Sequence, residues 1–281
     1  MKFKINKKIT PQDLSGTLKG DKLASIEYVS SFENADKECL AFYIGNSLEE
    51  IVSSDAKIII VNKSLELDDY CPKDKAIITC NNPMSLFVSI ICKDYDNKKE
   101  AFSKCSDFVS ENNIHVGKNT YISNNVSICT NTSIGDDCRV QPSSVIGSIG
   151  MAYVENDDFT KTRFPHLGGV SIGDCVDIGA NVTIVKGILK DTSIGDNTKI
   201  GNNVNIGHNV NIGKNCFISS GVTLAGSVII EDDCWIAPSV TIVNKVLIRK
   251  KSFISIGSLV SKDTEERGFY AGSPARKIKN V

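Results

Sequence analysis

A histidine and a glycine eighteen residues apart have the side-chain and backbone groups that acyl transfer requires. His208 stands in the stretch NIGHNVNIG, and Gly226 follows eighteen positions later. A neutral imidazole can take a proton from an amine that attacks a thioester. A backbone N–H can stabilise the oxyanion of the resulting tetrahedral intermediate. We therefore interpret His208 as a candidate general base and Gly226 as a candidate oxyanion donor, the simpler alternatives being a solvated histidine and a turn glycine.

A six-residue repeat predicts the elements that position these two residues. From residue 116 onward an apolar residue returns every six positions, usually followed by Gly, Ala or Ser: Val116, Ile122, Ile128, Ile134, Val140, Ile146, Ile172, Ile178, Ile184, Ile194, Ile200, Ile206, Ile212, Ile218, Leu224, Ile230, Ile236, Ile242, Ile248, Ile254 and Val260. This period is typical of parallel β-helices, in which each hexad forms one side of a three-sided prism. Repeats of this hexad type normally wind left-handed, and Gly and Asn at the corners help to tolerate this winding, because both enter left-handed backbone conformations cheaply. The predicted fold class is mainly β, a left-handed parallel β-helix with a small N-terminal α/β domain.

The repeat is interrupted at positions that share one edge of the predicted prism. Every third hexad lies on the same side, which brings together the long insertion Gly147–Gly169, the shorter one at Val185–Asp191, and His208. Gly226 and Asn244 continue the line at eighteen-residue intervals. Because binding sites concentrate in loops on a rigid scaffold, this edge is the predicted active site.

The remaining histidines and the cysteines do not indicate a metal site. His166 lies in the long insertion and is a candidate substrate-binding residue, whereas His115 is expected at the surface. A zinc site would need three converging histidines, and only His208 stands at a regular hexad of the middle solenoid. Ten cysteines without a CxxC pair fit a reducing compartment and the role of small core fillers.

Composition excludes several classes of function. The 281 residues include 32 Lys and Arg against 33 Asp and Glu, so no bulk positive field exists to hold nucleic acid. No apolar stretch is long enough for a signal peptide or a membrane span. We therefore expect a cytoplasmic protein without nucleic-acid or integral membrane contacts.

Two outward-pointing aromatic residues, Phe217 and Trp235, predict a subunit interface. A prism with flat sides can bury them by threefold packing, so we expect a homotrimer with its sites in the grooves between subunits.

The two ends of the chain differ from the repeat. Residues 1–110 alternate apolar runs with a helical pattern, as a small α/β domain would, and residues 111–262 form the β-helix domain. That residues 1–110 bind a nucleotide or sugar is implied only by the family resemblance given below. The C-terminal tail, 263–281, carries Arg276 and Lys277, cations suited to phosphates, although a solvated charged terminus would look the same.

The motifs resemble those of left-handed β-helix sugar N-acyltransferases, including the enzyme family that acylates UDP-3-O-acylglucosamine in lipid A synthesis. The matching stretches are VIGSIGMAY, FPHLGGVSIGDCVDIGANVTI, KGILKDTSIG and NNVNIGHNVNIGKN. The resemblance implies that His208 is the base and that a backbone amide at Gly226 stabilises the oxyanion. It also implies substrate-binding roles, which we expect for Asn202, His166, Tyr153, Lys186 and, as the aromatic of a uridine-binding module, Phe42.

The sequence also departs from this family. The acidic residue that steadies the family's histidine falls on Gly201, so another group must orient His208. Two uridine-binding positions of the family read Gly45 and Leu48. The ending ISIGSLV with GSPARKI instead resembles coenzyme A-dependent hexapeptide acetyltransferases, which implies that Gly257, Ser258, Arg276 and Lys277 bind coenzyme A.

The sequence thus predicts an N-acyltransferase that moves a short acyl group, acetyl or 3-hydroxyacyl, from acyl-CoA to a nucleotide-linked amino sugar for surface glycan or O-antigen synthesis. No permanently bound cofactor is expected. One alternative is the lipid A enzyme itself, which would use acyl carrier protein as the donor, and another is a non-catalytic β-helix scaffold. The sugar, its base, the acylated amino position and the acyl length are left open.

Overall fold

The computed structural model describes residues 1–67, 70–95 and 113–281, which form two compact units. One unit is Met1–Ala101 with Met151–Pro165, and the other is Phe102–Gly150 with His166–Val281. The boundary predicted near residue 110 falls outside the described residues.

The first unit is built on a six-stranded sheet in the order β1-β3-β4-β5-β6-β2. Its strands are β1 (Lys2–Ile9), β2 (Thr17–Gly20), β3 (Ile26–Ser30), β4 (Cys39–Tyr43), β5 (Ile58–Asn62) and β6 (Ala76–Cys80), and its helices are α1 (Leu48–Ser53) and α2 (Pro83–Tyr95), with 3-10 turns at Pro11–Asp13 and Phe32–Asn34. The four central strands are parallel and the two edge strands antiparallel. Continuous apolar runs such as IIIV in β5 are buried on both faces, as parallel strands require.

A hairpin from the long insertion belongs to this first unit. It comprises β13 (Tyr153–Glu155) and β14 (Lys161–Arg163). Two bonds attach it to the start of α2: the Asn82 amide donates to the Glu155 carbonyl at 3.0 Å, and the Ser85 hydroxyl donates to the Asn156 side chain at 2.8 Å. The insertion is therefore partly an integral piece of the N-terminal unit.

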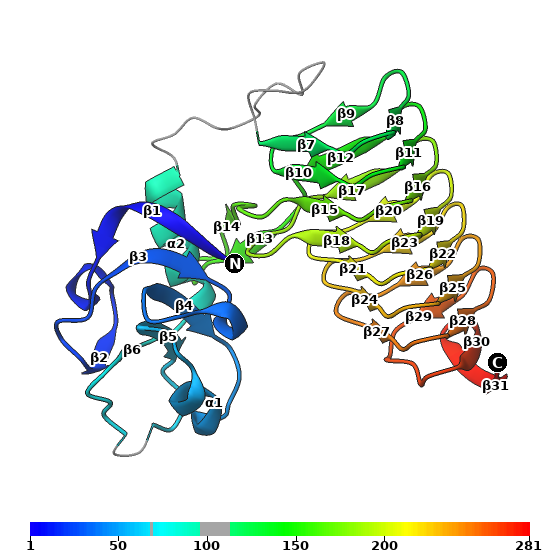
Figure 1. Ribbon diagram of the computed structural model, residues 1–281. Coiled ribbons are helices and arrows are strands. Elements are labelled where there is room, and N and C mark those ends of the chain that lie inside the picture. The colour runs from blue at the N-terminus through cyan, green and yellow to red at the C-terminus, as the bar shows by residue number, and fades with distance from the viewer. Residues whose placement is uncertain (68–69, 96–112) are drawn as a thin grey trace. The chain divides into compact units, whose positions relative to one another are not determined.

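The second unit is a solenoid whose coils place one short strand on each of three sheets, parallel throughout except for the last pair, β30 with β31 (Figure 1). The first sheet contains β7 (Ile114–Val116), β10 (Thr132–Ile134), β15 (Val170–Ile172), β18 (Thr192–Ile194), β21 (Asn211–Ile212), β24 (Ile229–Ile230) and β27 (Leu247–Ile248). The second contains β8 (Tyr121–Ile122), β11 (Arg139–Val140), β16 (Asp177–Ile178), β19 (Lys199–Ile200), β22 (Phe217–Ile218), β25 (Trp235–Ile236), β28 (Phe253–Ile254), β30 (Gly268–Gly272) and β31 (Ala275–Asn280). The third contains β9 (Ser127–Ile128), β12 (Val145–Ser148), β17 (Thr183–Val185), β20 (Asn205–Ile206), β23 (Thr223–Leu224), β26 (Thr241–Ile242) and β29 (Leu259–Val260).

The hexad residues form the core of this solenoid. Ile184, Ile206, Leu224 and Ile242 pair in register on successive strands of the third sheet, and each is at most 1% exposed. Burying an aliphatic side chain contributes about 1.5–3 kcal/mol, so the repeated ladder stabilises every coil. The corners recur with positive φ, for example 57° at Asn203 and 60° at Asn209, which explains the frequent Asn there. The predicted fold class is confirmed.

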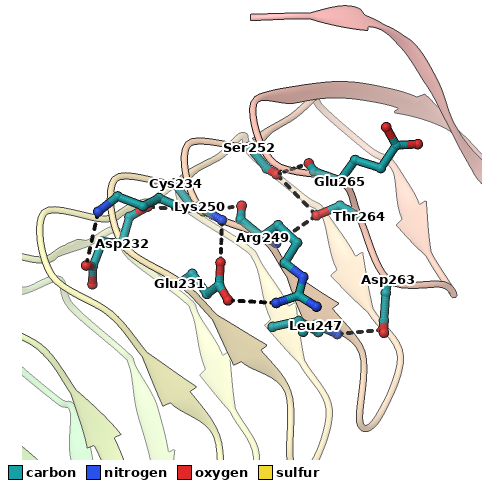
Figure 2. A network of polar contacts seen from close by, with 10 residues as sticks. All are labelled: Glu231, Asp232, Cys234, Leu247, Arg249, Lys250, Ser252, Asp263, Thr264 and Glu265. Atoms are coloured by element: carbon teal, nitrogen blue, oxygen red, sulfur yellow. Dashed lines mark hydrogen bonds and ion pairs between the residues drawn. The ribbon is translucent and has the colours of Figure 1, made fainter.

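A short segment closes the C-terminal end of the first sheet (Figure 2). Asp263 and Thr264 bond the edge strand β27: the Leu247 N–H donates to Asp263 Oδ1 at 2.9 Å, and the Thr264 N–H donates to the Leu247 carbonyl at 3.0 Å. The Arg249 N–H donates to Thr264 Oγ1 at 2.8 Å. These contacts occupy backbone groups that an exposed edge strand would offer to another chain.

Candidate functional site

The interrupted edge predicted from the repeat is confirmed by the strand pairing. Strands β12, β17, β20, β23 and β26 are consecutive neighbours in the third sheet, so the corners that follow them stack along one edge of the prism. The long insertion begins within β12, and the short loop Val185–Asp191 begins at the last residue of β17. His208, Gly226 and Asn244 follow the next three strands. We call this corner the loop edge.

His208 and Gly226 are in direct contact on the loop edge. The His208 side chain is half-buried, and a Cβ built on Gly226 would lie 2.5 Å from its Nε2 and 2.6 Å from its Cε1. Only glycine therefore leaves room for the ring at this position. Among the described residues, the Gly226 N–H donates no hydrogen bond, and the Gly226 carbonyl accepts from the Lys245 N–H at 3.0 Å.

Asn209 supplies the orienting contact that the sequence did not reveal. Its Oδ1 lies 2.9 Å from Nδ1 of His208, and its side chain is buried. At Gly201, where the resemblance places an acidic residue, a Cβ would lie 2.6 Å from the Ser220 nitrogen, so the corner has no space for a side chain. The adjacent His-Asn pair in the sequence was the available signal, but it does not reveal where the amide points.

The two loops of this edge are bonded to each other through glycine-rich backbone. The Leu167 N–H donates to the Ile188 carbonyl at 2.8 Å, and the Gly187 N–H donates to the Gly169 carbonyl at 3.0 Å. A Cβ on Gly187 would lie 1.6 Å from the Lys190 carbonyl oxygen. A Cβ on Gly168, in the long insertion, would lie 2.4 Å from the same carbonyl oxygen, so the close approach of the two loops requires glycine at this position.

His166, immediately before this contact, lies beside the candidate base. It is 3% exposed, and its ring centroid is 6.0 Å from that of His208 with the rings edge-on at 85°. Its Nε2 would be 3.2 Å from a Cβ on Gly150. The structure thus brings His166 to the loop edge, while its contact with a substrate stays a prediction.

Lys186 also lies on the loop edge, in the corner one coil before His208. Its side chain is 7% exposed, and its backbone N–H donates to the Ser148 carbonyl at 3.0 Å. Lysine side chains are rarely buried unless a polar group pairs with them. Substrate binding stays the prediction for Lys186.

Two of the predicted substrate-binding residues belong to the first unit. Tyr153 lies in β13, where the Arg163 guanidinium lies over its ring at 4.8 Å and donates to its hydroxyl at 2.5 Å. Phe42 lies in β4 with its ring centroid 4.9 Å from that of Phe87. Tyr153 and Phe42 therefore each pack against another residue of the first unit, and their binding of a substrate stays a prediction.

Asn202 occupies a different corner of the prism from His208. It follows β19 of the second sheet, and its Oδ1 accepts a hydrogen bond from the Ala180 N–H at 2.8 Å. The side chain thus links successive coils, and substrate binding stays a prediction for Asn202.

The four residues expected to bind coenzyme A are not on the loop edge. Gly257, with φ of 65°, and Ser258 follow β28, and the Ser258 side chain is only 1% exposed, so its hydroxyl faces the interior. Arg276 and Lys277 lie on β31; Lys277 pairs with Glu265 at 2.6 Å, and Arg276 is exposed. Of these four, the exposed Arg276 guanidinium offers the clearest contact for a phosphate.

The described cysteines are free thiols, and several are buried in the two cores. Burial raises the pKa of Cys39 to about 11 and also raises the pKa of Cys138. A thiol with a raised pKa is a poor nucleophile and metal ligand. Within the described ranges, no group of three or more His, Cys, Asp or Glu side chains could hold a metal ion.

No helix among the described residues is long and apolar enough to cross a membrane.

Comparisons with known proteins find the same six-residue repeat in acyltransferases. Residues 113–148 and 191–226 match the family described as bacterial transferase hexapeptide (six repeats). A UDP-3-O-acylglucosamine N-acyltransferase from Herminiimonas arsenicoxydans is 37% identical over 160 residues, 57% of this chain and 45% of the relative. A probable mitochondrial UDP-3-O-acylglucosamine N-acyltransferase from Arabidopsis thaliana is 37% identical over 154 residues, 55% of this chain and 50% of the relative. The chain thus spans about half the length of these curated relatives.

Solved structures show the same solenoid. A UDP-N-acetylglucosamine acyltransferase from Francisella novicida superposes with a TM-score of 0.55 at 28% identity, covering 60% of each chain. One from Bacteroides fragilis superposes with a TM-score of 0.52 at 22% identity, covering 62% of this chain and 74% of the other, which shows the fold alone. The chain therefore has the hexapeptide-repeat β-helix fold, and its repeats match the bacterial transferase hexapeptide model over residues 113–148 and 191–226.

Proposed function

We propose that this protein is an N-acyltransferase that moves an acyl group from a thioester to the amino group of a nucleotide-linked glucosamine. The observation that carries the proposal is the contact of His208 with Gly226 on the loop edge, which puts a candidate base beside the residue whose backbone N–H is the candidate oxyanion donor. The names of the curated relatives favour a UDP-linked 3-O-acylglucosamine as the acceptor.

The geometry supports the following reaction. The acceptor amine attacks the thioester carbonyl carbon, a C–N bond forms, and Nε2 of His208 takes the amine proton. The Gly226 N–H donates to the carbonyl oxygen while it carries negative charge. When the intermediate collapses, the C–S bond breaks and the imidazolium returns its proton to the departing thiolate. Atoms and charge balance, and the enzyme is unchanged.

The candidates for acceptor binding are the residues that the sequence predicted. His166 and Lys186, buried on the loop edge, are the candidates for the sugar and its substituents. Phe42 and Tyr153 are the candidates for the nucleotide, in keeping with aromatic stacking on a base, and Asn202 is a further candidate for the acceptor.

The donor is a thioester of either acyl carrier protein or coenzyme A. Acyl carrier protein is the donor we expect if the acceptor is the UDP-3-O-acylglucosamine named by the curated relatives. A short acyl group from acyl-CoA to another nucleotide amino sugar is the second candidate, and the exposed Arg276 guanidinium, suited to a phosphate, favours it.

We further propose a homotrimer whose subunits pack on the second sheet. Phe217, Trp235, Phe253 and Phe269 stack along that sheet with ring centroids 4.5, 6.1 and 5.1 Å apart, and Trp235 is 47% exposed. Phe217 and Trp235 are exposed and Phe253 and Phe269 half-buried, and a row of stacked aromatic side chains that reaches the surface is a feature of subunit interfaces.

The test is thiol release by the full chain from acyl carrier protein or coenzyme A thioesters with a panel of nucleotide amino sugars, including UDP-3-O-acylglucosamine. We expect turnover with a UDP-linked glucosamine and a loss of about 100-fold or more in His208→Ala. His115→Ala, an exposed histidine in β7, is the matched control and should keep wild-type turnover. Equal rates for His208→Ala and wild type would remove His208 as the base, and no turnover with any pair would favour a non-catalytic scaffold.

A further inference from the structure

The side-chain amide of Asn209 is fixed at both of its polar atoms by the short loop. Its Oδ1 accepts the Ile188 N–H at 3.2 Å, and its Nδ2 donates to the Lys190 carbonyl at 3.1 Å. A backbone N–H can only donate and a carbonyl can only accept, so turning the amide over would break both bonds. The oxygen is therefore the atom that faces Nδ1 of His208 at 2.9 Å.

This arrangement selects one tautomer of the neutral imidazole. Because an amide oxygen only accepts, the proton must sit on Nδ1 of His208, which leaves the lone pair on Nε2. Nε2 is the ring nitrogen against Gly226, where the amine proton would be received in the proposed reaction. A free histidine side chain in water favours the opposite tautomer, with its proton on Nε2.

The backbone of Asn209 is held by the same part of the chain. Its N–H donates to Thr192 Oγ1 at 2.9 Å, and the Thr192 hydroxyl donates to the Val185 carbonyl at 2.7 Å. Asn209 has φ of 60°, a conformation that Asn adopts more readily than most residues, and it is 7% exposed. Side chain and backbone of Asn209 are thus both bonded to the segment Val185–Thr192, which runs from the end of β17 to the start of β18.

We propose that Asn209 is a positioning residue that holds His208 in the tautomer with the proton on Nδ1, and that the short loop Val185–Asp191 fixes its amide. The kinetic consequence rests on the proposed acyl transfer, whereas the tautomer itself does not. An amide orients the ring without adding charge, whereas a carboxylate in the same place would also stabilise the imidazolium.

The tautomer can be read directly by long-range proton–nitrogen NMR on the full chain labelled with ¹⁵N-histidine, the His208 signals being identified by their loss in His208→Gln. We expect wild type to carry the proton on Nδ1. Asn209→Gly, which removes the amide and tolerates positive φ, should shift the population toward the Nε2-protonated form. Its kcat should fall about 10- to 100-fold with KM nearly unchanged, because orienting partners act through the group they hold.

Asn209→Asp separates orientation from charge. Its carboxylate still accepts from Nδ1, so the wild-type tautomer should persist, and the acidic limb of the kcat/KM profile should move to higher pH. Asn181→Gly is the matched control: Asn181 is an exposed corner residue with φ of 54°, and the substitution should change neither the tautomer nor the rate.

Each outcome decides the proposal. A wild-type His208 protonated on Nε2, or an unchanged tautomer in a folded Asn209→Gly, would overturn it. If the glycine variant does not fold, Asn209→Asp decides, since protonation on Nε2 there would be equally fatal. A tautomer shift in a protein that transfers no acyl group would sustain this inference and refute the proposed function.

Discussion

The imidazole of His208 packs against the α-carbon of Gly226, one coil further along the solenoid: a Cβ on Gly226 would lie within 2.5 Å of Nε2. The candidate base would thus receive a proton beside a residue that carries no side chain. The same contact places Nε2 next to Gly226 of the neighbouring coil, whose N–H is the proposed oxyanion donor.

Gly226→Ala should remove most of the activity while the chain still folds. The added methyl must displace the His208 ring, and misplacement of a catalytic group by about 1 Å costs about 100-fold. We expect kcat/KM to fall by roughly that factor, with unchanged far-UV circular dichroism. Ser227→Ala, in the same turn, should retain activity, and an active Gly226→Ala would show that the close contact is not required.

Gly187→Ala should displace the backbone of the short loop Val185–Asp191 without removing any side chain of the loop edge. Its Cβ would lie 1.6 Å from the Lys190 carbonyl oxygen, so the loop must move and the bonds from Ile188 and Lys190 to Asn209 should weaken. We expect kcat to fall about 10-fold or more. Lys190→Ala keeps this backbone and removes only an exposed side chain, so similar losses in both variants would contradict the explanation.

Trp235→Glu should dissociate the proposed trimer. A carboxylate placed within a stacked aromatic ladder would be buried without a partner in the interface, which is strongly unfavourable. Light scattering after size-exclusion chromatography should give a trimer for wild type and a monomer for the variant. Leu23→Glu, at a residue 90% exposed in the first unit, is the control. A wild-type monomer would refute the proposed assembly.

Thr264→Val should destabilise the C-terminal end of the solenoid. The substitution keeps the shape but removes the oxygen that accepts from the Arg249 N–H, and leaving a buried donor unpaired costs about 1–3 kcal/mol. Thermal unfolding should therefore begin at a lower temperature than in Ser261→Ala, where an exposed hydroxyl is removed. Coincident melting curves would show that the contact in Figure 2 contributes little.

The sequence by itself determined the repeating part of this protein. A six-residue period is a local property, and because stacked parallel strands pair without slipping, counting hexads placed His208, Gly226 and both insertions on one edge. The inward Ile ladder followed from the same count, since inward and outward positions alternate along a strand.

Only the tertiary structure decided what the non-repeating segments do. It assigned the hairpin Tyr153–Arg163 to the first unit, turned Ser258 into the interior, and revealed Asn209 as the partner of His208. A period does not specify these features. The direction of an amide and the path of an inserted loop depend on bonds between segments distant in sequence, such as that from Ile188 to Asn209, and those bonds exist only once the coils have stacked.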